Sequence, residues 1–158
     1  MMTTLSERTD LSSGDRCQIL DLFARFAWAY DIGDANAYAD TFSEDAVIRV
    51  GEFRVQGRDA ICATLEEFFL KRDPAITCVH QACNLVVAGD NRECSVWNYW
   101  LLFENQEREK NMVLQRVDRQ YSRCIYVSEQ WLFLERVFSI ELTSHIPWTS
   151  IGTKPIRL

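Results

Sequence analysis

The sequence predicts one α+β domain in which three N-terminal helices pack on a strongly curved, mixed or antiparallel sheet. Apolar residues recur every three or four positions in the first half, and long β-rich runs separated by turns fill the second half. The 158 residues, of which 47% are hydrophobic, can supply one core and little more. We expect a flexible N-terminus at 1–14, a domain at 15–142 and a C-terminal tail at 143–158.

The first helix is expected to begin at a cap among Ser12, Ser13 and Asp15 and to end near Gly33. Between these points, apolar side chains at steps of three and four residues form one buried stripe. The stripe consists of Ile19, Leu22, Phe23, Phe26, Ala27 and Tyr30.

The next two elements are short. Asp34 is a suitable cap for a second helix that carries Tyr38 and Phe42. The two-residue turn Gly51–Glu52 then predicts a small hairpin whose strands are 46–50 and 53–56.

A third helix is expected directly after Gly57. It spans 58–71 and ends before Asp73–Pro74, because the residue that precedes a proline disfavours helical geometry. Its inner face is expected to consist of Ile61, Leu65, Phe68 and Phe69.

The rest of the chain is expected to form an antiparallel meander of four strands. These strands span 76–88, 93–104, 112–126 and 131–142. Several of them are apolar on both faces, whereas a sheet covered on one face only should alternate. We therefore expect the outer face to contact another subunit in a homodimer or homotrimer.

Composition argues against several classes of function. The net charge is -6 and the basic residues are scattered, so we expect no nucleic-acid partner. The sequence lacks a signal peptide and has no apolar run near the ~18 residues that a membrane span needs, so we expect a cytoplasmic protein without a membrane partner.

The six cysteines form no C-x-x-C pair and are expected to be reduced thiols. His80 and His145 have no partner three or four residues away, so no metal is expected.

Asp31 is the first candidate for chemistry. It lies at the edge of the buried stripe in the last turn of the first helix, where the helix end already carries partial negative charge. A buried carboxylate there needs a cation or a donor to face it. In the alternative interpretation, Asp31 points to water and helps to end the helix beside Gly33.

His80 is the second candidate. Strand periodicity places Cys78, Ala82, Asn84 and Val86 on its face, a set that suits the wall of a cavity. A neutral imidazole is a competent base near pH 7, and a carboxylate such as Asp31 improves it by holding the other ring nitrogen. The alternative is a core histidine whose ring is satisfied by a backbone carbonyl.

Three stretches carry a resemblance to a known family. They are YDIGDANAYADTFSEDAVIRV within 19–69, CVHQACNLVV and YSRCIYVSEQWLFLERV. Together they resemble the SnoaL-like branch of the nuclear-transport-factor-2-like (NTF2-like) superfamily over most of the chain. The resemblance implies a cone-shaped fold that encloses an apolar pocket.

The resemblance also implies roles for individual residues. Asp31 and His80 match a base dyad similar to that of scytalone dehydratase and hexachlorocyclohexane dehydrochlorinase. Tyr30 precedes the aspartate as a tyrosine does in the dehydratase, and Asn84 matches a polar residue that follows the histidine in the dehydrochlorinase.

The pocket is expected to bind a small apolar molecule. Besides Asn84, its candidate lining residues are Phe26, Phe53, Trp97 and Tyr99. The acid that assists the leaving group stays open among Tyr30, Tyr99, Arg116 and Asp118.

Two functions remain in competition. The first is a cofactor-independent lyase or isomerase: a dehydratase, dehydrohalogenase, double-bond isomerase or cyclase that acts on a small apolar substrate, cyclic compounds included. The second is a non-catalytic binding or assembly module, such as the small subunit of aromatic-ring hydroxylating dioxygenases, which shares this fold. An open cavity that reaches His80 would favour the enzyme.

Overall fold

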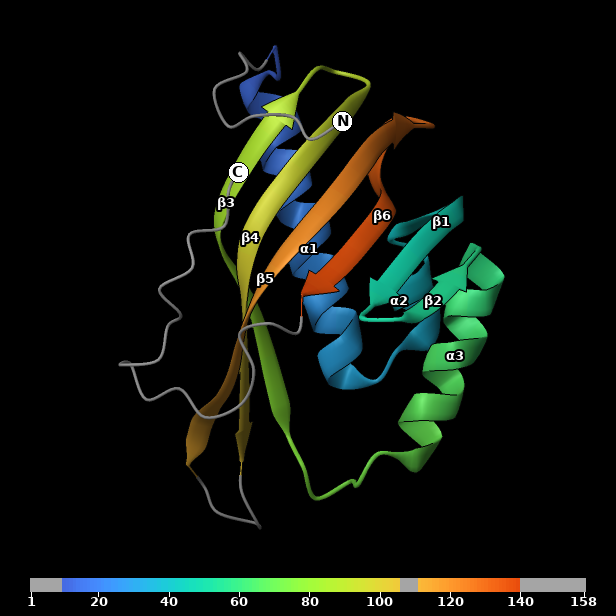
Figure 1. Ribbon diagram of the computed structural model, residues 1–158, viewed down its shortest axis with the longest axis vertical. Coiled ribbons are helices and arrows are strands. Elements are labelled where there is room, and N and C mark those ends of the chain that lie inside the picture. The colour runs from blue at the N-terminus through green and yellow to red at the C-terminus, as the bar shows by residue number, and fades with distance from the viewer. Residues whose placement is uncertain (1–9, 106–110, 140–158) are drawn as a thin grey trace.

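The computed structural model describes residues 10–105 and 111–139 and confirms the expected α+β fold (Figure 1). Its helices are α1 (Ser13–Ile32), α2 (Ala35–Ala39) and α3 (Arg58–Lys71). Its strands are β1 (Phe42–Val50), β2 (Phe53–Gln56), β3 (Cys78–Gly89), β4 (Glu93–Asn105), β5 (Met112–Val127) and β6 (Gln130–Ser139). The expected domain start at residue 15 falls inside α1, and the expected tail at 143–158 lies outside the described residues.

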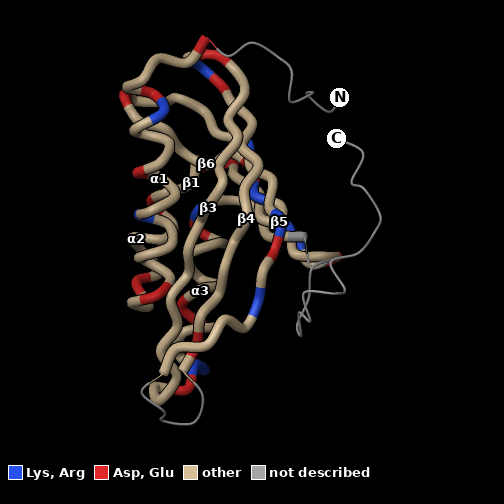
Figure 2. The backbone as a smooth tube through the Cα atoms, turned by 90° about the vertical axis from the view of Figure 1, so that its left-hand side faces the viewer, with Lys and Arg blue, Asp and Glu red and all other residues tan. Residues whose placement is uncertain are grey.

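The described strands form one mixed sheet in the order β2-β1-β6-β5-β4-β3. All neighbouring pairs are antiparallel except β1 and β6, which run parallel. The helices lie on one face of this curved sheet, as the side view in Figure 2 shows. Because β3 is an edge strand, one row of its backbone groups faces away from β4.

Helix α1 forms as its sequence predicts. Ser12 caps it in a capping box: the Asp15 amide donates to the Ser12 hydroxyl at 3.1 Å, and the Ser12 amide donates to the Asp15 carboxylate at 3.0 Å. Gly33 ends the helix in a left-handed conformation with φ 77°. The buried face of the helix consists of Ile19, Leu22, Phe23, Phe26, Ala27 and Ala29.

Two aromatic residues differ from expectation. Phe42 opens β1 instead of extending α2, because α2 ends at Ala39 and the Thr41 hydroxyl donates to the Tyr38 carbonyl at 2.6 Å. Phe42 is fully buried there. Phe68 was expected on the inner face of α3 but is 49% exposed, because it lies at the rim, where its ring centroid is 5.9 Å from that of Tyr30.

The outer face of the sheet carries the remaining large aromatic side chains of β4. Trp97 packs against Tyr121 of β5 with ring centroids 5.6 Å apart, and Tyr99 is 38% exposed. The expected contact of this face with a second subunit stays a prediction. Within the described part of the chain, no helix combines the length and hydrophobicity needed to cross a membrane.

Gly89, at the end of β3, provides a test of the hairpin geometry. Its φ is 148°, and a Cβ built there would meet the Glu93 carbonyl oxygen and lie 2.6 Å from the Cys94 Cα. We expect Gly89→Ala to lower the free energy of unfolding in urea by about 1–3 kcal/mol. Gly14→Ala is the matched control, because its Cβ would meet only the Ser12 hydroxyl at 3.5 Å. Equal stability of the two variants would contradict this description of the hairpin.

Candidate active site

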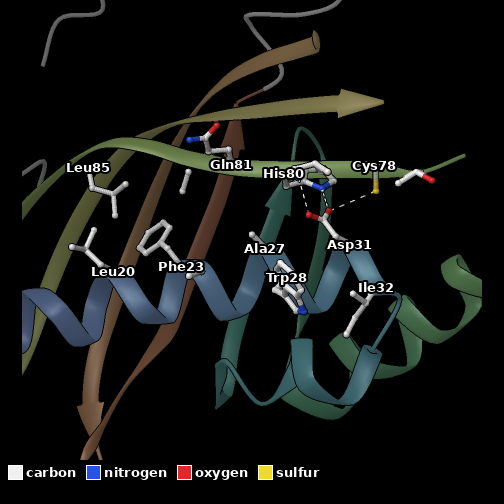
Figure 3. A pocket seen from close by; sticks show the side chains of 14 residues that line it. Leu20, Phe23, Ala27, Trp28, Asp31, Ile32, Cys78, His80, Gln81 and Leu85 are labelled. Carbon is white, nitrogen blue, oxygen red and sulfur yellow. Dashed lines mark hydrogen bonds and ion pairs between the residues drawn. The ribbon is translucent and has the colours of Figure 1, made fainter. Parts of the chain in front are cut away.

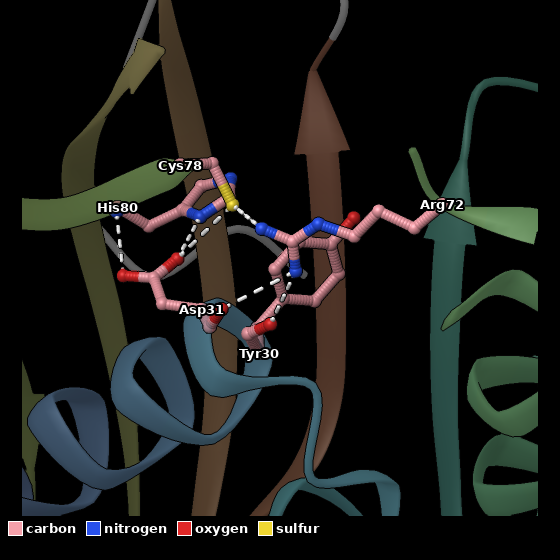
Figure 4. Close-up of polar contacts among 5 residues, drawn as sticks. All are labelled: Tyr30, Asp31, Arg72, Cys78 and His80. Atoms are coloured by element: carbon pink, nitrogen blue, oxygen red, sulfur yellow. Dashed lines mark hydrogen bonds and ion pairs between the residues drawn. The ribbon is translucent and has the colours of Figure 1, made fainter. Parts of the chain in front are cut away.

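The structure brings Asp31 and His80 into direct contact (Figure 4). The Asp31 Oδ1 lies 2.6 Å from the His80 Nδ1, and the Asp31 Oδ2 accepts the His80 backbone N–H at 2.9 Å. Both side chains are largely buried, with 7% of the His80 side chain and 15% of the Asp31 side chain exposed. Asp31 therefore faces the interior and does not point to water.

The position of β3 at the sheet edge explains this double contact. His80 pairs with Leu102 of β4, but its N–H has Asp31 as an acceptor from the last turn of α1. One carboxylate thus satisfies a free edge N–H and holds the imidazole of the same residue. With Asp31 as the acceptor, the proton of a neutral His80 ring belongs on Nδ1, and Nε2 is left as the basic atom.

Cys78 adds a third group to the cluster. Its thiol donates to the Asp31 Oδ1 at 3.6 Å, and burial raises the pKa of this thiol to about 11, so it stays protonated at neutral pH. The ligand-type atoms of Asp31, Cys78 and His80 lie within 4.8 Å of one another. However, both Asp31 oxygens already accept hydrogen bonds, and the Arg72 guanidinium contacts the Cys78 sulfur. A cation at that position opposes a metal dication, so the geometry favours a carboxylate–imidazole pair.

Tyr30 packs edge-on against the imidazole. The ring centroids of Tyr30 and His80 are 4.8 Å apart at an interplanar angle of 82°. Burial raises the pKa of Tyr30 to about 12, so the phenol keeps its proton at neutral pH and can donate a hydrogen bond.

A groove of about 530 Å³ runs between α1 and β3 and includes both members of the pair (Figure 3). Its walls are mainly apolar. The lining residues are Leu20, Phe23, Ala24, Ala27, Trp28, Asp31, Ile32, Thr77, Cys78, Val79, His80, Gln81, Ala82 and Leu85. Asp31 and His80 are therefore the groups in this groove that are suited to proton transfer.

The inner face of β4, β5 and β6 is polar where the sequence suggested an apolar cone. At most 5% of each of five polar side chains is exposed: Asn98, Asp118, Gln120, Ser122 and Arg136. Each of them has at least one buried nitrogen or oxygen without a hydrogen-bond partner in the described part of the chain. Among the described residues, these atoms comprise both hydrogen-bond donors and hydrogen-bond acceptors without a partner.

Arg136 is the least expected member of this wall. Its guanidinium lies 4.0 Å from the centre of the Phe26 ring and 4.5 Å from that of Phe133, and it donates to the Gln120 side-chain oxygen. Burial lowers the pKa of Arg136 to about 10, so the group is still cationic at neutral pH.

The structure places the residues that the sequence suggested as the acid that assists the leaving group. Asp118 is buried and forms an ion pair at 2.7 Å with Arg116, whose side chain is 40% exposed, while the Asp118 Oδ1 has no hydrogen-bond partner among the described residues. Burial raises the pKa of Asp118, against the opposing effects of Arg116 and His80. Tyr99 points to the opposite face of the sheet and does not reach the interior.

Four expected lining residues lie elsewhere. Trp97 and Tyr99 occupy the outer face, because the inner face of β4 is taken by the alternate positions Asn98 and Trp100. Phe53 sits at the exposed end of the β1–β2 hairpin with 55% of its surface accessible. Phe26 is 1% exposed and belongs to the aromatic core, where it does not line the groove.

Asn84 is displaced by a β-bulge. The β3–β4 register shifts between Cys83 and Val86, and Asn84 adopts a left-handed φ of 53°. The side-chain alternation therefore reverses, so that Leu85 packs on the core while Asn84 and Val86 are exposed. The expected face that joined Asn84 and Val86 to His80 is wrong beyond Ala82.

Sequence reasoning did not single out Arg72 or Arg136. For Arg136 a signal was present: Glu135 and Arg136 are neighbours in a predicted strand, so one of these two charged side chains had to face inward. For Arg72 there was none, because the Tyr30 and Asp31 carbonyls that it binds lie more than 40 residues away in the sequence.

The fold and this site define a cone-shaped α+β protein of the NTF2-like type with a carboxylate–imidazole pair. The family profile described as SnoaL-like domain matches residues 12–137. The chain therefore belongs to the SnoaL-like family, as its motifs suggested. No curated protein sequence matches it.

Solved structures share the fold at low identity. ActVI-ORFA from Streptomyces coelicolor is 19% identical with a TM-score of 0.72, over 80% of this chain and 97% of that one. A protein provisionally named scytalone dehydratase, from Novosphingobium aromaticivorans, is 20% identical with a TM-score of 0.68, over 79% and 83%. An NTF2-like protein with a cystatin-like fold from the same species is 22% identical with a TM-score of 0.65, over 79% and 80%.

The contact geometry predicts the tautomer of His80. With the ring neutral, nitrogen-15 NMR should show the proton on Nδ1, because Asp31 accepts it. Asp31→Asn should shift the population toward the Nε2–H form, since the amide can donate to Nδ1. Asp21→Asn, an exposed change on the same helix, is the control. An Nε2–H tautomer in the unaltered protein would contradict the assigned contact.

Proposed function

We propose that this protein is a cofactor-independent lyase or isomerase of the dehydratase, dehydrohalogenase, double-bond isomerase or cyclase kind. The observation that carries the proposal is the contact between Asp31 and His80 beside a largely apolar groove. Membership of the SnoaL-like family is consistent with it, as is the likeness in fold to the protein provisionally named scytalone dehydratase.

In the proposed mechanism, His80 is the general base. Its Nε2 removes a proton from the substrate, and Asp31 holds the Nδ1–H and stabilises the imidazolium that forms. A base of this kind contributes about 10²–10⁴-fold to the rate, and orientation of the substrate in the groove adds to it.

The proposed substrate is a small ring compound. The apolar groove would bind the carbon skeleton, while the buried donors and acceptors of β4, β5 and β6 would pair with oxygen substituents. Negative charge that develops on such an oxygen would be stabilised by the Tyr30 phenol or by the buried Arg136 cation. Asp118, with its free Oδ1, is a further candidate to hold a substrate hydroxyl.

Hydrogen–deuterium exchange tests the proposal without knowledge of the natural substrate. In D₂O, we expect the protein to accelerate deuterium incorporation next to the carbonyl of cyclic ketones, measured by proton NMR. His80→Gln should lower this rate by about 10²–10⁴-fold. His145→Gln, the change at the only other histidine, should leave the rate unchanged. A His80→Gln rate equal to that of the unaltered protein would refute the base role, and no exchange with any ring ketone would refute the substrate class.

A further inference from the structure

Helix α1 ends in an electrostatically unfavourable way. Its last turn contains no basic residue, and it presents the Asp31 carboxylate where the helix dipole is already negative. The carboxylate is mostly buried, so water screens this repulsion only weakly. Something other than α1 itself must offset the accumulated negative charge.

Arg72 supplies the missing cation from another element. It follows directly after α3, and its Nη1 donates to the carbonyl oxygens of Tyr30 at 3.2 Å and of Asp31 at 3.3 Å. The second terminal nitrogen contacts the Cys78 sulfur, next to the Asp31 Oδ1 (Figure 4). One guanidinium therefore joins the end of α1, the end of α3 and the start of β3.

We propose that Arg72 is the positioning residue of the Asp31–His80 pair. By binding the carbonyls of Tyr30 and Asp31 together with Cys78, it fixes the last turn of α1 at the distance from β3 at which Asp31 reaches His80. Its charge also offsets the dipole that would otherwise repel the ionised carboxylate. Arg72 acts through Asp31 and is not itself a catalytic residue. The inference rests on the proposed base role of His80.

The fork geometry of arginine is needed for this task. A lysine ammonium is a compact point charge, which cannot bridge two carbonyls and reach a sulfur at the same time. We therefore expect Arg72→Lys to keep part of the effect and Arg72→Gln to lose it. Lys71→Gln is the matched control, because the neighbouring Lys71 is 72% exposed and its ion pair is with Glu67 on the surface of α3.

Two measurements report directly on the contact between Asp31 and His80. The first is the His80 tautomer, from nitrogen-15 NMR of histidine-labelled protein with a neutral ring. The second is hydrogen exchange of the His80 backbone N–H, whose acceptor is Asp31. In Arg72→Gln, we expect the Nδ1–H population to fall and this amide to exchange about tenfold faster or more, because a charge-assisted contact is lost. The Val96 amide, in the buried part of β4, serves as an internal reference for global stability.

The possible outcomes separate the inference from the proposed function. Wild-type values of both quantities in Arg72→Gln, while Asp31→Asn changes them, would overturn the role of Arg72 and leave the pair intact. If Asp31→Asn changes neither quantity, the pair fails and the proposed function fails with it. If Arg72→Gln does not fold, Arg72→Lys decides: a tautomer population and His80 exchange rate equal to those of Lys71→Gln would refute the inference.

Discussion

The contact between Asp31 and His80 joins the last turn of α1 to the edge strand β3. The sheet ends at β3, whose outward backbone groups would otherwise face α1 without partners. Asp31 reaches this edge from α1 and accepts two hydrogen bonds from His80. These two bonds fix the position of the last turn of α1 relative to β3. The groove between them, the orientation of the imidazole and the place of Tyr30 beside it all depend on this junction.

This junction buries the Asp31 carboxylate, and neighbouring donors and a cation stabilise its negative charge. Three contacts from two residues, Cys78 and His80, surround the carboxylate, and Arg72 offsets the dipole of α1 at the Asp31 backbone carbonyl. Deeper in the cone, Arg136 is held by aromatic faces and by the Gln120 amide without a carboxylate partner in the contacts of the described chain. In the low dielectric of the interior, these contacts are electrostatically stronger than they would be in water.

The sequence predicted the elements well and the faces of the strands less well. The caps, the helix-ending Gly33 and the apolar periodicity located α1 and α3 because these signals are local. Asn84 could not be placed, because a bulge depends on how β3 pairs with β4, and a shift of one residue reverses every later side chain. The faces of Trp97 and Tyr99 were ambiguous for a related reason: β4 is aromatic on both sides, so alternation gives no choice between them.

For the site, the same contrast between local and distant information holds. Asp31 and His80 could be paired from the sequence because a family resemblance supplied the distant contact. Arg72 belongs to no such pattern, and its contacts with the Tyr30 and Asp31 carbonyls arise only when the end of α3 returns to the end of α1. The polar wall that includes Asn98, Asp118 and Gln120 could not be predicted from the sequence of a single strand either. Its members come together only through the register of β4 and β5. The residues that position and surround the pair are therefore a property of the assembled sheet, and variation among them can alter what the cone accepts without changing the pair.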